Sequence, residues 1–182
     1  MNEELEFLRY MVDGLDEAGL PYMLTGSMAM MFYAVPRMTR DIDFVVECRL
    51  EDVPRVLEVF HPDCYLSEDA VRDAITRPGM FNIIHAKWAI KADLIVRRQS
   101  EYRELEFSRR RAMVVGDLSV AVVSPEDLIL SKLDWARDSA SASQCQDVAQ
   151  LLMAGSNLDI DYLERWAGAL GVLDQLNELG RS

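Results

Sequence analysis

Residues 22–44 read YMLTGSMAMMFYAVPRMTRDIDF, in which a polar turn and a helix-forming stretch join two apolar segments. The run 22–25 predicts a buried strand that ends at Gly26 and Ser27. A strand that turns directly into a helix presents free backbone N–H groups where an anion is favoured, and a glycine lets a ligand approach closely. Gly26 and Ser27 are therefore candidate phosphate-binding residues, with a plain capping turn as the alternative.

The second apolar segment carries two acidic residues. Asp41 and Asp43 lie in a strand predicted over 41–47, and residues two apart on a strand project to the same face of the sheet. Two carboxylates at that distance repel each other unless a cation lies between them or one stays protonated. Mg²⁺ prefers oxygen ligands and bridges to substrate phosphates, so the pair is a candidate magnesium site. The alternative is a half-exposed strand with a polar outer face.

A third carboxylate lies in the strand predicted over 88–96. Asp93 can align beside the other two aspartates if its strand neighbours theirs. Three converging carboxylates would hold two metal ions, one to activate an attacking hydroxyl and one to bind a triphosphate and its leaving pyrophosphate. Lys91 is on the same strand face as Asp93 and either partners the acidic cluster or forms a plain salt bridge.

The rest of the pattern predicts an α/β (α+β) fold, in which a mixed sheet flanked by helices is followed by a helical lobe. Apolar periodicity predicts early helices near 5–19, 28–32, 53–60 and 67–75, and further strands at 81–86, 88–96, 112–115 and 118–122. The last two strands form a hairpin around Gly116 and Asp117. Beyond them only helices are predicted, at roughly 125–138, 144–154, 160–169 and 172–179. We therefore divide the chain into a core over 1–122 and a C-terminal helical lobe over 123–182.

Two charged residues of the lobe lie at its apolar stripes. Lys132 falls within the stripe of the first helix, so it either extends its ammonium group to solvent or meets anions in a cleft. If that helix packs beside the acidic cluster, Lys132 reaches the triphosphate. Asp147 borders the stripe of the next helix, where it pairs with Lys132 or Arg137 or simply lies at the rim.

Taken together, these residues resemble a known family. The string Leu24-Thr25-Gly26-Ser27, followed after thirteen residues by Asp41-Ile42-Asp43-Phe44, is similar to the signature of the DNA polymerase β-like nucleotidyltransferase superfamily. The segment 37–43 looks like the Arg-x-[Ser/Thr]-x-Asp-x-Asp form of its AbiEii-type or MenT-type bacterial branch, and the segment 124–133 resembles a helical motif of that branch. Some members of the branch are toxins of toxin–antitoxin pairs.

The resemblance implies a metal-dependent nucleotidyltransferase with a nucleotidyltransferase core over 1–122. Such an enzyme transfers a nucleoside monophosphate from an NTP, such as ATP, to a hydroxyl acceptor and releases pyrophosphate. The implied acceptor is RNA, a protein or a small molecule, and a cognate antitoxin is a candidate partner. The implied cofactor is a pair of Mg²⁺ ions, with Mn²⁺ as a substitute. The implied catalytic and metal-binding residues are Asp41, Asp43 and Asp93, and the implied nucleotide-binding residues are Gly26, Ser27, Arg40, Lys132 and Asp147. The alternative hypothesis is a catalytically inactive member of the same fold that binds a nucleotide or a partner protein.

Composition limits the expected partners and the expected cellular compartment. The net charge of −12 argues against non-specific binding of DNA, because such binding depends on neutralising phosphates. The arginine-rich stretch 97–111 is either a local basic patch or a salt-bridged surface, since glutamates interrupt it. The three cysteines are scattered, as in a reducing compartment, and no segment has the pattern of a signal peptide or the length of a membrane span. We therefore expect a cytoplasmic protein.

Overall fold

The computed structural model describes residues 3–35, 41–139 and 141–180 and contains a seven-stranded mixed sheet. Its strands are β1 (Tyr22–Thr25), β2 (Asp41–Val46), β3 (Cys64–Tyr65), β4 (Met80–His85), β5 (Lys91–Val96), β6 (Arg111–Val115) and β7 (Leu118–Val122). Their spatial order is β3-β4-β5-β2-β1-β7-β6. β2 and β5 are parallel neighbours, as are β1 and β7, and the other neighbouring pairs are antiparallel.

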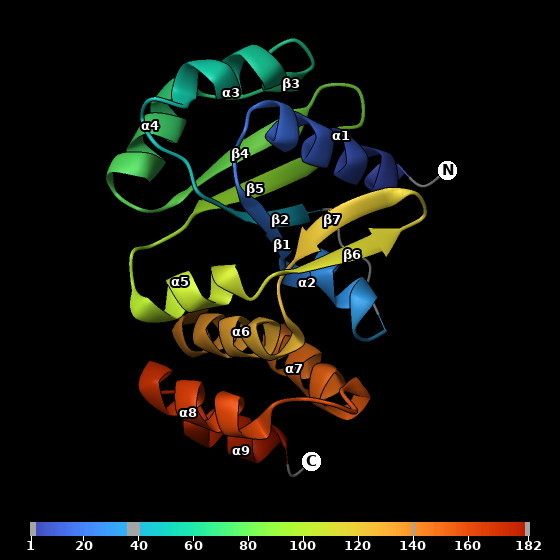
Figure 1. Cartoon of the computed structure of the whole chain (residues 1–182), viewed down its shortest axis with the longest axis vertical. Helices are drawn as coiled ribbons and strands as arrows, with labels where there is room; N and C mark the ends of the chain where they lie inside the picture. The colour runs from blue at the N-terminus through green and yellow to red at the C-terminus, as the bar shows by residue number, and fades with distance from the viewer. Residues whose placement is uncertain (1–2, 36–40, 140, 181–182) are drawn as a thin grey trace.

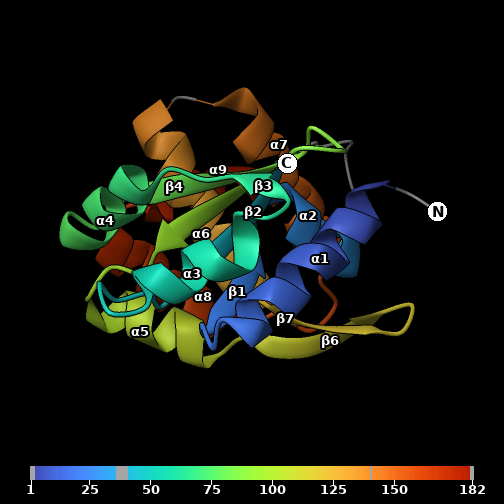
Figure 2. The same cartoon turned by 90° about the horizontal axis from the view of Figure 1, so that it is seen from above.

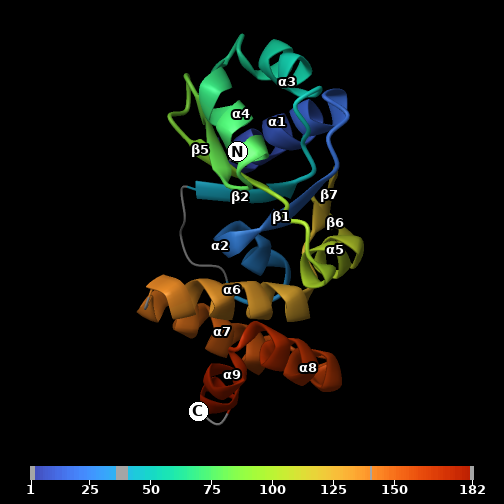
Figure 3. The same cartoon turned by 90° about the vertical axis from the view of Figure 1, so that its left-hand side faces the viewer.

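Helices lie on both sides of this sheet. They are α1 (Glu3–Glu17), α2 (Gly26–Ala29), α3 (Val53–Phe60), α4 (Glu68–Thr76), α5 (Glu101–Ser108), α6 (Pro125–Ser139), α7 (Ala142–Ala154), α8 (Ile160–Leu170) and α9 (Leu173–Leu179). The helices α1, α3 and α4 cover one side, and the C-terminal helices stack on the other (Figures 1 and 3). Viewed from above, α1 and α3 lie across the strands (Figure 2). The predicted mixed sheet flanked by helices is confirmed.

The alternation of buried and exposed residues along the strands decides which face carries chemistry. In β4 every second side chain is buried, and the buried His85 packs edge-on against the rings of Phe7 and Tyr10 in α1. The residues between them, such as Asn82, therefore point to the other face. β2 alternates in the same way. One sheet face is thus packed against α1, α3 and α4, and the side chains of Asp41, Asp43 and Asn82 lie on the opposite face.

The structure also contains two elements that the sequence did not predict. β3 has only two residues, which is too short for an alternating pattern to be recognised. α5 lies within the arginine-rich stretch, where the charged residues around the buried Tyr102 and Phe107 obscure the apolar period of a helix in the sequence. Its N-cap is Ser100, whose hydroxyl accepts a hydrogen bond from the Arg103 N–H. The hairpin with its Gly116 turn and the four C-terminal helices agree with the prediction.

The C-terminal helices α6 to α9 lie together on one side of the sheet (Figures 1 and 3). Buried side chains of these helices belong to the same hydrophobic cluster as those of the sheet and α1, so one core runs through both parts. The boundary of core and lobe at residue 122 stays a prediction. Within the described ranges, no helix combines the length and apolar character needed to cross a membrane.

Candidate active site

Strand register brings three carboxylates to one face of the sheet. Asp43 pairs with Asp93 between the parallel strands β2 and β5, and Asp41 pairs with Lys91 two residues earlier. Because in-register residues of neighbouring strands project to the same side, the three acids of this acidic cluster point together. Asp41 is exposed, Asp43 is half-buried and Asp93 is buried. The sheet therefore places all three aspartates singled out by the sequence at one spot.

The turn between β1 and α2 lies directly against this acidic cluster. Thr25, the last residue of β1, pairs with Asp43, and Gly26 follows with a positive φ of +63°. A Cβ atom on Gly26 would lie 2.7 Å from Cγ of Asp43, so only glycine leaves room for the carboxylate there. Ser27 comes next and is buried at the start of α2. The close approach that the sequence assigned to a ligand at Gly26 is thus made by the side chain of Asp43.

Two neighbouring side chains hold Asp93. The Lys91 Nζ lies 2.9 Å from one carboxylate oxygen of Asp93 and 3.8 Å from an oxygen of Asp41. The amide of Asn82, on β4, donates a hydrogen bond to the other oxygen of Asp93. Lys91 therefore pairs with the cluster as a built-in counter-cation. Asn82 was not predicted, because its position opposite Asp93 depends on the pairing of β4 with β5.

The electrostatics of the acidic cluster appear most clearly at Asp43. Burial raises the pKa of this carboxyl from 3.8 to about 6, and the negative charges of Asp93 and Asp41 add to the effect. The ammonium groups of Lys132 and Lys91 act in the opposite direction and lower the same pKa. At Asp43 the repulsion from the other two carboxylates thus outweighs the attraction of the two lysines, and a divalent cation would reduce it.

The donor chemistry of the acidic cluster fits a hard divalent cation. Three carboxylates on one sheet face offer the oxygen ligands that Mg²⁺ and Mn²⁺ prefer. In the described part of the chain, no three His, Cys, Asp or Glu side chains are already arranged as a metal-binding group. The oxygens of Asp93 are instead turned to Lys91 and Asn82. A metal ion bound at this cluster would compete with the Lys91 ammonium group for Asp93.

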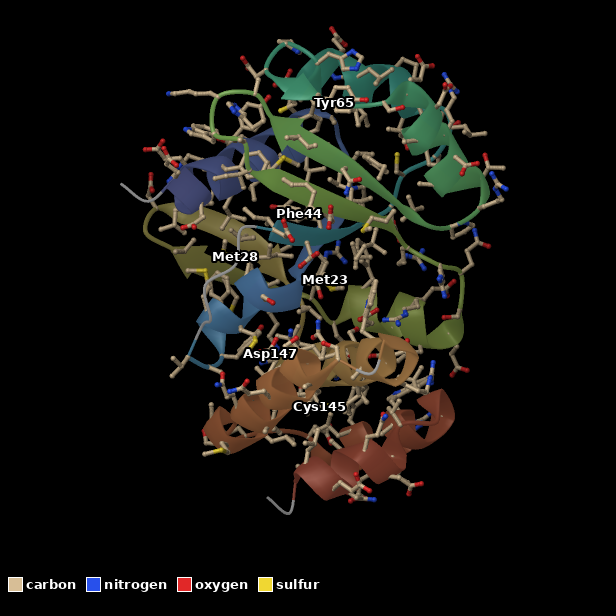
Figure 4. All side chains as sticks on the ribbon, turned by 180° about the vertical axis from the view of Figure 1, so that it is seen from behind. Met23, Met28, Phe44, Tyr65, Cys145 and Asp147 are labelled. Atoms are coloured by element: carbon tan, nitrogen blue, oxygen red, sulfur yellow. The ribbon has the colours of Figure 1, made fainter. Side chains whose placement is uncertain are left out.

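Lys132 and Asp147 form a buried ion pair beside the cluster. The Lys132 Nζ lies 2.7 Å from a carboxylate oxygen of Asp147 and 3.1 Å from the side-chain oxygen of Gln144. Lys132 is 3 % exposed, so it does not extend to solvent but faces the anions of the cleft. Asp147 is labelled in Figure 4, on the side of the C-terminal helices that faces the sheet. Gln144 was not predicted, since it precedes the apolar stripe of α7.

A cleft with a volume of about 510 Å³ opens between the sheet face and α6. Gly26, Asp43, Asp93 and Lys132 line its inner part. Arg97, Arg98 and Arg103 line its outer part. Several arginines of the stretch 97–111 are paired with acids. The pairs include Arg97 with Glu47 at 2.7 Å, Arg103 with Asp134 at 2.8 Å and Arg109 with Asp127 at 3.0 Å. The salt-bridged interpretation of this stretch is thus confirmed for these residues, although Asp127 is fully buried.

Arg40, the predicted nucleotide-binding residue that precedes Asp41, lies outside the described residues. Arg137, the alternative partner of Asp147, instead pairs with Asp134 at 2.7 Å.

Comparison with known proteins identifies the fold. No family model matches the chain, and no curated protein matches its sequence. Among solved structures, ANT(2″)-Ia in complex with adenylyl-2″-tobramycin matches with a TM-score of 0.64 and 14 % identity over 93 % of this chain and 98 % of that one. The lincosamide antibiotic adenylyltransferase LnuA, bound to lincomycin, matches with a TM-score of 0.54 and 15 % identity over 83 % and 96 % of the two chains.

A third match is TM1012 from Thermotoga maritima, provisionally described as a nucleotidyltransferase. It has a TM-score of 0.55 and 16 % identity over 92 % of this chain and 94 % of that one. At these identities the likeness shows the fold. The chain therefore has the α/β fold of nucleotidyltransferases, with Asp43 and Asp93 of the acidic cluster lining the inner part of its cleft.

Proposed function

We propose that this protein is a metal-dependent nucleotidyltransferase that moves a nucleoside monophosphate from an NTP to a hydroxyl acceptor. The observation that carries the proposal is the in-register pairing of Asp43 with Asp93, with Asp41 on the same face. A cluster of three carboxylates in a cleft raises the free energy of the protein unless cations bind there. A substrate triphosphate brings divalent cations with it, which makes the cluster useful in phosphoryl chemistry.

The residues of the inner cleft are assigned to the metal ions and to the triphosphate. Asp41, Asp43 and Asp93 would hold the metal ions, which supply charge neutralisation for the triphosphate and lower the pKa of the attacking hydroxyl when they are bound. Gly26, Ser27 and the buried Lys132 would bind the phosphates, and Asp147 would position Lys132. Arg40 is proposed as a further nucleotide contact from the sequence resemblance alone.

The proposed reaction is a substitution at the α-phosphorus of the NTP. The acceptor hydroxyl oxygen forms a bond to the α-phosphorus, and the bond from that phosphorus to the bridging oxygen of the pyrophosphate breaks. The hydroxyl proton passes to a carboxylate of the cluster, for which Asp93 is proposed because it lines the cleft beside Asp43. The products are the nucleotidylated acceptor and pyrophosphate.

Finer assignments follow from the sequence strings. The segment 37–43 and the helical motifs at Lys132 and Asp147 support a place in the AbiEii-type or MenT-type branch, and with it a toxin–antitoxin role with a cognate antitoxin. The tobramycin and lincomycin named for the two antibiotic-modifying neighbours support a small-molecule acceptor instead. ATP and Mg²⁺ are proposed as nucleotide and metal. Free Cys48, Cys64 and Cys145 support a reducing, cytoplasmic setting.

One observation favours a second candidate, a nucleotide-binding protein without transfer activity. The ammonium group of Lys91 already neutralises Asp93 and lies near Asp41, so a single lysine charge partly fills the role of a metal ion. If Lys91 stays in place, the protein binds nucleotides without divalent metal. Metal dependence of nucleotide binding therefore separates the two candidates.

The test is transfer of label from α-³²P-labelled NTPs to a whole-cell extract, with and without Mg²⁺. The wild-type protein is expected to label an acceptor only with metal, and Asp41→Asn and Asp43→Asn are expected to abolish labelling. Asp161→Asn, an exposed aspartate of α8, is the matched control and should label normally. Labelling that persists in both cluster variants would refute the proposal.

A further inference from the structure

The cleft continues past the acidic cluster toward the carboxyl ends of β2 and β5. Its floor there is one apolar row, because Met80 pairs with Ile95 and Ile95 pairs with Val45. Met80 is 47 % exposed, and the other two side chains are half-buried. Trp135 of α6 lines the same part of the cleft and is 57 % exposed. Apolar side chains exposed together in a concave site are typical of a ligand-binding surface.

Charge in this outer part of the cleft comes from arginines and their partners. Arg103 holds both lining carboxylates, those of Glu106 at 2.9 Å and Asp134 at 2.8 Å. Glu106 is also almost fully buried. These acids are therefore poorly placed to receive the amino groups of a cationic ligand.

Arg98 differs from these paired groups. It lines the cleft two residues beyond the end of β5 and is exposed. Across the residues that the structure describes, its guanidinium forms no ion pair with a carboxylate. A guanidinium in this state is a ready partner for a carboxylate or phosphate of a ligand.

The triphosphate of the proposed reaction belongs at the inner end of the cleft. Gly26 and Lys132 lie there beside Asp43, whereas the apolar row and Arg98 lie at the outer end. An attacking hydroxyl approaches the α-phosphorus on the side opposite the leaving pyrophosphate. From Asp93 to Val96, β5 extends roughly 10 Å away from the cluster, which is the length of a small ligand's body.

We infer that the acceptor is a hydroxylated small molecule with an apolar body and one anionic end. Its hydroxyl reaches the acidic cluster, its body covers the row Met80, Ile95 and Val45 opposite Trp135, and its anionic end binds Arg98. The placement of the hydroxyl rests on the proposed function. A polycationic acceptor finds the carboxylates in the outer part of the cleft already paired with Arg103, and a nucleic acid would need more than one arginine for its phosphates. The cleft volume of about 510 Å³ suits a small molecule.

The experiment measures binding by calorimetry with ω-hydroxy fatty acids of increasing chain length, without nucleotide. The wild-type protein is expected to bind one length best and to bind its methyl ester more weakly. Arg98→Met is expected to weaken binding of the acid by about tenfold or more, as for loss of a charge-assisted hydrogen bond, and to leave the ester unchanged. Val45→Asp is expected to weaken both. Arg49→Met removes the same charge from a highly exposed residue outside the cleft and should change neither.

Two results would overturn the inference. One is equal affinity of wild type and Arg98→Met for the acid, and the other is tighter binding of tobramycin, a polycation, than of any hydroxy acid. Failure of the proposed function has a different signature. In that case the hydroxy acid binds as expected, but no protein–metal–NTP mixture transfers label to it or to any extract component.

Discussion

Gly26 and Asp43 are in direct contact across the strands β1 and β2. A Cβ atom on Gly26 would lie 2.7 Å from Cγ of Asp43, and the backbone of Gly26 has a φ of +63°. The turn proposed to bind phosphate and the carboxylate proposed to bind metal are therefore built against each other. Any side chain at position 26 displaces the Asp43 carboxylate from the acidic cluster.

This contact predicts the effect of Gly26→Ala. The variant is expected to lose Mg²⁺-dependent nucleotide binding. Its free energy of unfolding is expected to be about 2 kcal/mol or more below that of wild type, because alanine at this position combines a left-handed backbone with a steric clash. Gly116→Ala is the matched control, since Gly116 also has a φ of +63° but nothing within 4 Å of its added Cβ. Its expected loss is about 1 kcal/mol with normal nucleotide binding. Urea unfolding and calorimetry give both quantities, and equal effects of the two variants would contradict the account.

Asp43 predicts a pH dependence of stability in metal-free protein. Its pKa is raised from 3.8 to about 6 by burial and by its acidic neighbours, so folding favours the protonated form. The stability that this proton provides is complete below pH 4 and is lost as the pH rises through about 6. Asp43→Asn removes the penalty of the buried charge and is expected to be more stable than wild type above pH 6, by on the order of 2 kcal/mol. Urea unfolding between pH 4 and 8 tests this, and parallel pH profiles of the two proteins would count against it.

The buried pair of Lys132 and Asp147 predicts asymmetric effects of substitution. Lys132→Met leaves the carboxylate of Asp147 buried beside the acidic cluster and is expected to destabilise the protein by about 3 kcal/mol. The double variant Lys132→Met with Asp147→Leu is expected to recover part of that loss, because no uncompensated charge remains. Both variants should lose nucleotide binding, since each lacks the ammonium group. A double-mutant cycle in urea measures the coupling, and additive losses would show that the two side chains act independently.

A second buried network joins the sheet region to the C-terminal helices. Asp127 is fully buried and accepts hydrogen bonds from Arg109 at 3.0 Å and from the Tyr162 hydroxyl at 2.6 Å. Arg109→Met is expected to cost about 3 kcal/mol, and Tyr162→Phe about 1 kcal/mol. Circular dichroism and tryptophan fluorescence should report one shared unfolding transition, because the hydrophobic core is continuous. Two separated transitions in the wild-type protein would show that the C-terminal helices unfold independently.

Local patterns in the sequence were sufficient to predict part of the candidate site. The i, i+2 spacing of Asp41 and Asp43 requires only that a strand forms, and Asp93 lies in an equally clear strand. The contact between Gly26 and Asp43 could not be predicted in the same way, because it depends on the antiparallel register of β1 with β2.

Other features depended on packing between distant elements. Asn82 reaches Asp93 only through the pairing of β4 with β5. The burial of Lys132 is decided by how α6 and α7 pack, since a lysine within an apolar stripe is equally compatible with a solvent-exposed ammonium group. α5 was missed because its buried residues, Tyr102 and Phe107, are separated by charged residues that obscure a helical period.

The central claim is that Asp41, Asp43 and Asp93 hold divalent metal together with an NTP. Its most direct test is Mn²⁺ binding followed by electron paramagnetic resonance, with a non-hydrolysable NTP analogue present. The wild-type protein is expected to bind two Mn²⁺ ions per chain. Asp43→Asn and Asp93→Asn are each expected to lose at least one of them. Wild-type stoichiometry in both variants would contradict the claim.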